Sequence, residues 1–212
     1  GRPYSWRRSG RLAAAPYSEL GSALWTEDNV TYQGKYYQVK DLTIDPKPAQ
    51  QPHPPFWMGG GSMPFEKKYG QTVAKIDPVL KRIARYAKTW VPHSSSTIGM
   101  IQSDWDKIRA FTGDCGRPAD DISKVYNNWV YVLKKGEPPE AAIEHFSVYS
   151  GMDLPYWREH YLLGEAEEVA EKIAARVSTL GGCEWAVLNP LNWEEEQLEL
   201  LANEVLPLAE KG

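Results

Sequence analysis

The sequence predicts an α/β fold of the TIM-barrel type, in which this chain supplies roughly the second half as four parallel β/α units, together with a β-hairpin insertion. Four short apolar runs rich in β-forming residues recur between residues 56 and 188, and stretches with helical spacing separate them. Residues 30–39 are β-formers around a central glycine, a pattern typical of a hairpin. Alternating strands and helices favour a parallel sheet, and an open half-barrel leaves two strand edges bare. We therefore expect the other half of the barrel to be supplied from elsewhere.

The first part of the chain is expected to hold a helix, the hairpin and a connector. Pro16 suits the first turn of a helix, and apolar residues continue at helical spacing as far as Trp25. Prolines recur through residues 45–55, which argues against a helix there and predicts an extended connector. We interpret residues 30–55 as an insertion within a single domain that covers residues 1–212.

The barrel-like part is expected to follow as alternating strands and helices. Asp77 and Pro78 predict a helix start with Asp77 as its cap, and the serines of residues 94–96 predict the cap of the next helix. The aromatic stretch 154–163 is interpreted as lid-like. The predicted strands are 56–58, 89–92, 125–133 and 184–188. The predicted helices are 77–87, a helix with its buried face over 101–111, 165–180 and 194–209.

Composition places the chain among ordinary globular proteins. Of its 212 residues, 42% are hydrophobic and 25% are charged, which is enough to bury a core. The formal net charge of −4 gives no basic field to attract nucleic acid, and no apolar run is long enough to span a membrane. Two cysteines without CxxC spacing and four scattered histidines predict reduced thiols and no metal site. We expect a cytoplasmic location, no nucleic-acid or membrane partner, and a fragment or processed chain, because it begins at Gly1 without methionine.

The clearest signal for a ligand lies in residues 54–62, where two prolines and the apolar run Phe56-Trp57-Met58 precede three glycines and a serine. Glycines at the point where a strand meets a loop permit positive φ and the close approach of another group. Successive backbone N–H groups together with the Ser62 hydroxyl suit an anionic oxygen, usually that of a phosphate. A glycine turn without any ligand explains the same residues, because the pattern is neither a Walker loop nor a dinucleotide fingerprint.

Several motifs follow one another along the chain in a defined order. They are Leu24-Trp25-Thr26-Glu27-Asp28, Tyr32-Gln33-Gly34-Lys35-Tyr36-Tyr37, Pro46-Lys47-Pro48, Gln51-Pro52-His53-Pro54-Pro55-Phe56-Trp57-Met58-Gly59-Gly60-Gly61-Ser62, Arg85-Tyr86-Ala87-Lys88-Thr89-Trp90-Val91-Pro92 and Leu162-Leu163-Gly164-Glu165-Ala166-Glu167-Glu168-Val169-Ala170. In this order they resemble the bacterial luciferase-like monooxygenase family over nearly the whole chain. The resemblance implies a (β/α)8 barrel that holds FMN, or the deazaflavin F420, at its carboxyl-end face. It also implies that this chain provides strands five to eight and lacks the first four.

The same resemblance implies a flavin-dependent monooxygenase or oxidoreductase that uses reduced FMN or deazaflavin, with O2 in the FMN case, on a small organic substrate. In such a protein the cofactor carries the chemistry, while the chain positions it and excludes water. The implied partners are a supply of reduced cofactor, such as a flavin reductase, and either further copies of this chain or the missing N-terminal half.

Cofactor-binding residues follow from the resemblance by position. Gly60, Gly61 and Ser62 match the family's turn that approaches the cofactor phosphate. Trp90 and Ser94 lie where the family lines its flavin or substrate pocket, although Trp90 also suits plain filling of the barrel.

Reactive and substrate residues are expected in the same region. His93 is the catalytic candidate, because it could donate to a flavin carbonyl or act as an acid or base near neutral pH. Asn189 and Asn192 follow the last predicted strand and are candidates for substrate contact.

Two other classes of protein are compatible with the sequence. One is a non-catalytic partner that binds flavin or serves assembly. The other is a tryptophan-rich carbohydrate-binding module, which is disfavoured because the aromatic residues fall at core spacings rather than on one strand face.

Overall fold

The computed structural model describes residues 18–64, 76–143, 152–191 and 194–209. The chain forms two compact units, Gly1–Phe56 and Trp57–Gly212.

The first unit contains the predicted hairpin. Residues 18–26 are helical. Strands β1 (Val30–Gln33) and β2 (Gln38–Leu42) pair antiparallel, with Val30 opposite Leu42, which confirms the hairpin. Trp25 stacks on Phe56 with ring centroids 5.3 Å apart, so the end of the proline-rich connector packs against the helix.

The second unit contains two parallel three-stranded sheets. The first has the strand order β3-β4-β5 and the second the order β7-β6-β8. The strands are β3 (Trp57–Gly59), β4 (Thr89–Val91), β5 (Ser123–Lys124), β6 (Tyr126–Val132), β7 (Leu162–Gly164) and β8 (Ala186–Pro190). The helices are α2 (Asp77–Tyr86), α3 (Ile98–Asp114), α5 (Leu154–His160), α6 (Ala166–Thr179), α7 (Glu195–Leu200) and α8 (Leu206–Ala209), with a 3-10 turn at Pro139–Ala142 and a π turn at Leu201–Val205. This arrangement confirms the α/β class with parallel strands and is consistent with part of a barrel.

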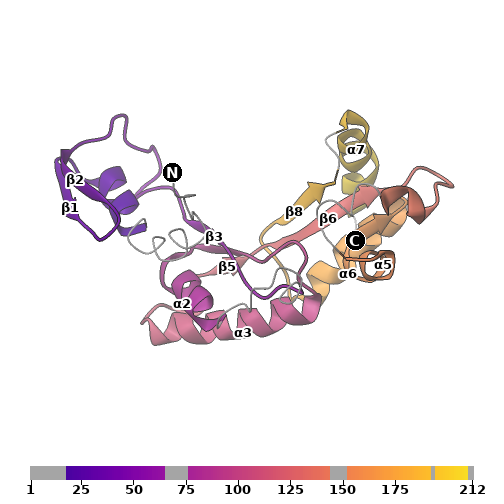
Figure 1. Ribbon diagram of the computed structural model, residues 1–212, viewed down its shortest axis with the longest axis horizontal. Coiled ribbons are helices and arrows are strands. Elements are labelled where there is room, and N and C mark those ends of the chain that lie inside the picture. The colour runs from indigo at the N-terminus through magenta and orange to yellow at the C-terminus, as the bar shows by residue number, and fades with distance from the viewer. Residues whose placement is uncertain (1–17, 65–75, 144–151, 192–193, 210–212) are drawn as a thin grey trace, which may run out of the picture. The chain divides into compact units, whose positions relative to one another are not determined.

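One face of these sheets is covered by helices. Figure 1 shows α2 and α3 running along the same side of β3 and β5. Successive strand residues point to opposite faces, and in β6 Tyr126, Val130 and Val132 point to the helix side and are fully buried. Apolar residues of the helices complete this core: Leu80, Ile83, Ile101, Ile108, Val169 and Ile173.

The opposite face is covered only in part, by a second buried apolar cluster that contains Tyr131, Leu133, Trp157, Tyr161 and Leu163. The register of β6 and β8 places Asn127, Trp129 and Asn189 on this face, since Trp129 lies opposite Asn189. Two large apolar side chains are exposed near the edge strands, Trp57 at 45% and Trp185 at 58%. Among the described residues, no strand pairs with the outer edge of β3 or of β8.

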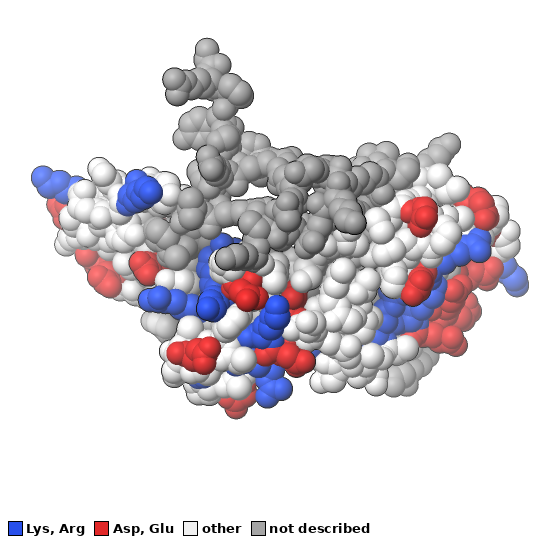
Figure 2. Space-filling model, turned by 60° about the horizontal axis from the view of Figure 1, so that its bottom comes forward, with Lys and Arg blue, Asp and Glu red and all other residues white. Residues whose placement is uncertain are grey.

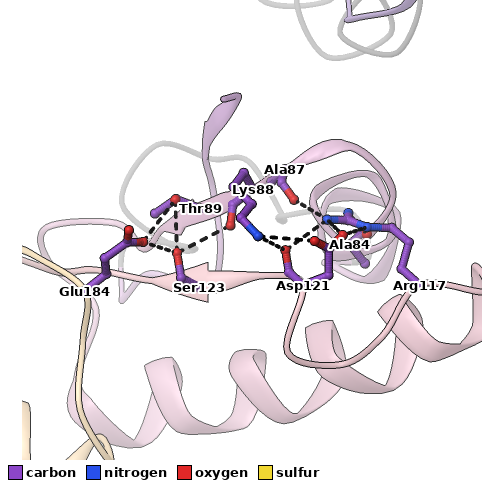
Figure 3. A network of polar contacts seen from close by, with 8 residues as sticks. All are labelled: Ala84, Ala87, Lys88, Thr89, Arg117, Asp121, Ser123 and Glu184. Carbon is purple, nitrogen blue, oxygen red and sulfur yellow. Dashed lines mark hydrogen bonds and ion pairs between the residues drawn. The ribbon is translucent and has the colours of Figure 1, made fainter. Parts of the chain in front are cut away.

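Polar contacts bind the amino ends of the strands together (Figure 3). Thr89 and Ser123 share a hydrogen bond of 3.0 Å at the starts of β4 and β5, and the Ser123 hydroxyl donates to Glu184 just before β8. The Arg117 guanidinium donates to the carbonyls of Ala84 and Ala87, at 2.5 and 2.8 Å, and so caps the end of α2. This end of the sheet is therefore occupied by contacts within the chain.

The outer surface carries charges of both signs. Figure 2 shows Lys and Arg side chains interspersed with Asp and Glu over the described part of the side on which α2 and α3 lie. None of the helices in the described ranges has the length and apolar character needed to cross a bilayer.

Several local predictions were wrong. Ile76, not Asp77, is the N-cap of α2, and Asp77 lies in its first turn; Thr97, rather than a serine of 94–96, caps α3 by accepting from the Met100 N–H. The 154–163 stretch is not a lid-like segment, because it forms α5 and enters β7. The predicted third strand, 125–133, is confirmed as β6, whereas the short strand β5 that precedes it and pairs with β4 was not predicted.

Candidate functional site

The carboxyl ends of the parallel strands bring together most of the described site candidates. The turn Gly60–Ser62 follows β3, the loop Pro92–Ser96 follows β4, and Asn189 lies near the end of β8. In open parallel sheets and in barrels this is the edge at which ligands bind.

The turn after β3 requires its glycines. Gly60 and Gly61 have φ values of +143° and +142°, a region that side chains rarely adopt. A Cβ on Gly60 would lie 2.8 Å from the Val79 side chain. The turn is tied to β4, because the Gly60 N–H donates to the Val91 carbonyl and the Trp90 indole N–H donates to the Gly60 carbonyl.

The donors of Ser62 bind a carboxylate of the same chain. The Ser62 N–H donates to Asp104 Oδ2 at 2.6 Å, and its hydroxyl donates to Asp104 Oδ1 at 2.9 Å. Asp104 is only 3% exposed. A Cβ on Gly61 would lie 3.0 Å from Asp104 Oδ2, so the second glycine also makes room for this carboxylate. The turn therefore holds an anionic group, as its donors suggest, and that group is internal.

The sequence contained a signal for Asp104 that pattern reasoning missed. The residue lies at helical spacing between Ile101 and Ile108, on the buried face of α3. A carboxylate on an otherwise apolar helix face requires hydrogen-bond donors in the core. Ser62 supplies them.

Hydrogen bonds join the two loops. The Ser96 hydroxyl donates to the Ser62 carbonyl at 2.6 Å, and the Ser96 N–H donates to the His93 carbonyl at 2.9 Å. Asp104, Ser62, Ser96 and His93 thus form a continuous chain of contacts from α3 to the loop after β4.

Ser95 is the centre of a second group of contacts. Its hydroxyl oxygen accepts from the Trp129 indole N–H at 3.2 Å and from the Tyr161 hydroxyl at 2.8 Å. Its carbonyl accepts from the Tyr156 hydroxyl at 3.0 Å. Burial raises the pKa of Tyr156 to about 12, so this hydroxyl stays protonated and remains a donor. Residues from β6, α5 and the start of β7 therefore fix the loop.

The same loop sets the state of His93. The Ser95 N–H donates to His93 Nδ1 at 3.1 Å, so Nδ1 carries a lone pair and the proton of the neutral ring lies on Nε2. Burial lowers the pKa of His93 below its usual value of 6.5. At neutral pH His93 is therefore an uncharged ring whose Nε2–H is a donor, which favours hydrogen bonding over proton exchange as its role.

The remaining candidates have different surroundings. Asn189 is half-buried and donates to Asn127 Oδ1 and to the Asn128 carbonyl, at 2.7 and 2.9 Å. Ser94 is half-buried in the loop after β4. Asn192 lies outside the described residues.

Trp90 lies on the helix side of β4. Its side chain is fully buried and stacks in parallel on Trp105 with ring centroids 6.0 Å apart. No face of the Trp90 ring is exposed to make the predicted contact with a cofactor. The side chain instead fills the core, which was the alternative.

The fold and the site together define a class of protein. Parallel strands, helices on one face, and loops with polar groups at the carboxyl edge are the architecture of a barrel-type α/β ligand-binding protein. The model of the family described as luciferase-like monooxygenase matches residues 15–153. The chain belongs to the luciferase-like monooxygenase family.

The curated proteins that the sequence matches include the following two relatives. The chain is 46% identical over 87 residues, 41% of its length, to the FMNH(2)-dependent dimethylsulfone monooxygenase of Pseudomonas putida. It is 27% identical over 157 residues, 73% of its length, to the F420-dependent glucose-6-phosphate dehydrogenase of Segniliparus rotundus. The matched parts span 20% and 42% of these relatives.

Solved structures share the fold. An F420-dependent secondary alcohol dehydrogenase superposes with a TM-score of 0.72 at 15% identity, covering 94% of this chain and 62% of the other. EDTA monooxygenase from Chelativorans sp. BNC1 superposes with a TM-score of 0.66 at 12% identity, covering 98% of this chain and 61% of the other. These likenesses confirm the fold, and this chain spans 62% and 61% of the length of the two structures.

Proposed function

We propose that this chain forms the later half of a flavin-dependent oxidoreductase that uses reduced FMN and O2 on a small organic substrate. The observation that carries the proposal is the family match over residues 15–153. The 46% identity to a relative named as FMNH(2)-dependent supports FMN as the cofactor. A bound flavin would supply the electrons for the reaction.

The residues at the carboxyl edge fit an uncharged ring system. His93 has a neutral ring with its proton on Nε2, and the amides of Asn127 and Asn189, which are hydrogen-bonded to each other, lie in the same region. The loop that carries His93 is held from three elements, which is the preorganisation that a bound ring requires. We assign to His93 the donation of a hydrogen bond to a cofactor oxygen, to Ser94 a cofactor contact, and to Asn189 and Asn192 contact with substrate.

The turn Gly60–Ser62 is proposed to face the phosphate end of the cofactor. Its donors suit an anion, as the contact with Asp104 illustrates. A phosphate can use the Ser62 donors only where Asp104 does not.

The open face and the strand edges support a partner. We propose that the N-terminal half of the barrel, or another copy of this chain, covers the face that carries Trp57 and Trp185, in a cytoplasmic assembly supplied with reduced flavin by a reductase. The exposure of these two tryptophans supports this proposal. The hairpin and connector 30–55 are proposed as the family's insertion.

A deazaflavin-dependent oxidoreductase is the second candidate. It is favoured by the relative named as an F420-dependent glucose-6-phosphate dehydrogenase, which matches 73% of this chain. Such a protein would transfer hydride and would not consume O2.

The test uses the whole gene product. Purified protein is mixed with FMN or F420, desalted, and scanned for retained cofactor absorbance; oxygen uptake is then followed with NADH and a flavin reductase. Retained FMN with substrate-dependent oxygen uptake supports the proposal, and retained F420 without oxygen uptake supports the second candidate. Retained FMN without turnover indicates a non-catalytic flavin-binding partner, and retention of neither cofactor contradicts both proposals.

A further inference from the structure

Asp104 is a buried carboxylate that is hydrogen-bonded to the Gly61–Ser62 turn. Among the described residues, no Lys, Arg or His side chain forms an ion pair with it. Its two oxygens accept from the Ser62 N–H and hydroxyl. Its other neighbours on α3 are the buried Ile101 and Ile108. None of the ion pairs between described residues includes Asp104. A charge in such surroundings depends on its donors, because burial without them is costly.

We propose that Asp104 is an internal anion that competes with an external phosphate for the two donors of Ser62, and thereby sets how far this turn favours a phosphorylated cofactor over an unphosphorylated one. The identity of the cofactor as a flavin depends on the function proposed above. The competition itself does not, because it concerns only the turn and any phosphate.

The physical argument has two parts. A single N–H and a single hydroxyl cannot serve the carboxylate and a phosphate with good geometry at the same time. A phosphate close enough to reach Ser62 would also lie within a few ångströms of the Asp104 charge, and like charges at such distances in a partly buried site repel strongly. The native turn therefore discriminates little between FMN and riboflavin, whose only difference is the phosphate.

The experiment compares these two ligands in matched variants of the whole gene product. Asp104→Asn removes the charge and keeps the size of the side chain. Asp106→Asn, on the exposed side of the same helix, removes a charge that does not touch Ser62 and serves as the control. The quantity measured is the ratio of the FMN and riboflavin affinities, from fluorescence titration, because contributions of the shared ring cancel in it.

We expect a ratio near one in the native protein and in Asp106→Asn, and an increase of about tenfold or more in Asp104→Asn. The double variant Asp104→Asn/Ser62→Ala lacks the hydroxyl donor and keeps the backbone N–H, so it should lose part of this gain. A ratio in Asp104→Asn equal to the native ratio would overturn the proposal.

A second measurement uses no flavin, and its titration of the native protein does not require Asp104→Asn to fold. Inorganic phosphate is titrated into 15N-labelled protein, and the amide resonances of Gly61 and Ser62 are followed. We expect no shift in the native protein and a saturable shift in Asp104→Asn; a saturable shift of equal affinity in the native protein would overturn the proposal.

The single variant Ser62→Ala, in which Asp104 is retained, supplies the remaining check. If the Ser62 donors belong to Asp104, this variant leaves the FMN to riboflavin ratio unchanged, and a fall in that ratio would contradict the competition. Failure of both flavins to bind would refute the proposed function alone, since the phosphate titration still decides the role of Asp104.

Discussion

The Ser95 contacts allow a quantitative prediction about what holds the His93 loop. Ser95→Ala removes two hydrogen bonds, from the Trp129 indole and the Tyr161 hydroxyl, whereas Tyr161→Phe removes only the second. At about 1 kcal/mol for each bond, Ser95→Ala should lower the free energy of unfolding by about 2 kcal/mol and Tyr161→Phe by about 1 kcal/mol. The double variant should lose about 2 kcal/mol rather than 3, because the two single changes remove one bond in common.

The assay is urea denaturation of the four proteins, with FMN affinity measured in parallel. A coupling energy of about 1 kcal/mol is expected between the two sites. Additive effects would show that the bond between Tyr161 and Ser95 contributes nothing, and the explanation of how the loop is fixed would then be wrong. Ser95→Thr, which keeps the hydroxyl, is the matched control and should retain more stability than Ser95→Ala.

Three further predictions concern the site and the opposite end of the sheet. Burial lowers the pKa of His93, so as the pH falls below about 6.5 the histidine of the unfolded chain is protonated before that of the native protein. The free energy of unfolding should therefore decline over this pH range. In urea denaturation at several pH values, His93→Gln should remove that part of the decline. Gly61→Ala should lower the free energy of unfolding by about 2 kcal/mol, because the residue has a φ of +142°. The control is Gly99→Ala in α3, where no heavy atom lies within 4 Å of the added Cβ, and this change should be neutral or stabilising. Equal effects of the two substitutions would refute the strain argument. Hydrogen bonds from Arg117, the larger effect, and from Lys88 lower the pKa of Asp121. The stabilisation by the ionised Asp121 is therefore complete above about pH 4 and is lost as the pH falls further. If the stability of Asp121→Asn fell with acid as steeply as that of the native protein, this prediction would be contradicted.

The sequence predicted those parts of the fold that depend on local pattern. Residues 30–39 alternate β-formers around Gly34, and the structure has a hairpin there. Trp57-Met58 and Thr89-Trp90-Val91 are short apolar runs between turn residues, and both became parallel strands. β7 was missed because Leu162 and Leu163 were assigned to the aromatic stretch 154–163, and this segment is a strand through its pairing with β6.

The site was predictable only in part, because the sequence shows local patterns but not contacts between residues that are far apart along the chain. Gly60, Gly61 and Ser62 were found because consecutive glycines are a local signal, but the partner of Ser62 lies 42 positions away on α3. Ser95 gathers donors from 34 to 66 positions away, and no local pattern connects these residues. Trp90 was correctly placed in a strand, but which face of the strand it occupies was decided by the packing of α3 against β4.

The claim that the carboxyl ends of the strands bind a flavin is tested most directly by mapping where FMN acts on the protein. In a titration of FMN into the 15N-labelled whole gene product, we expect amide shifts at His93, Ser95 and Asn189. Shifts confined to Thr89 and Ser123 at the amino ends, or no saturable shift at either end, would contradict the claim.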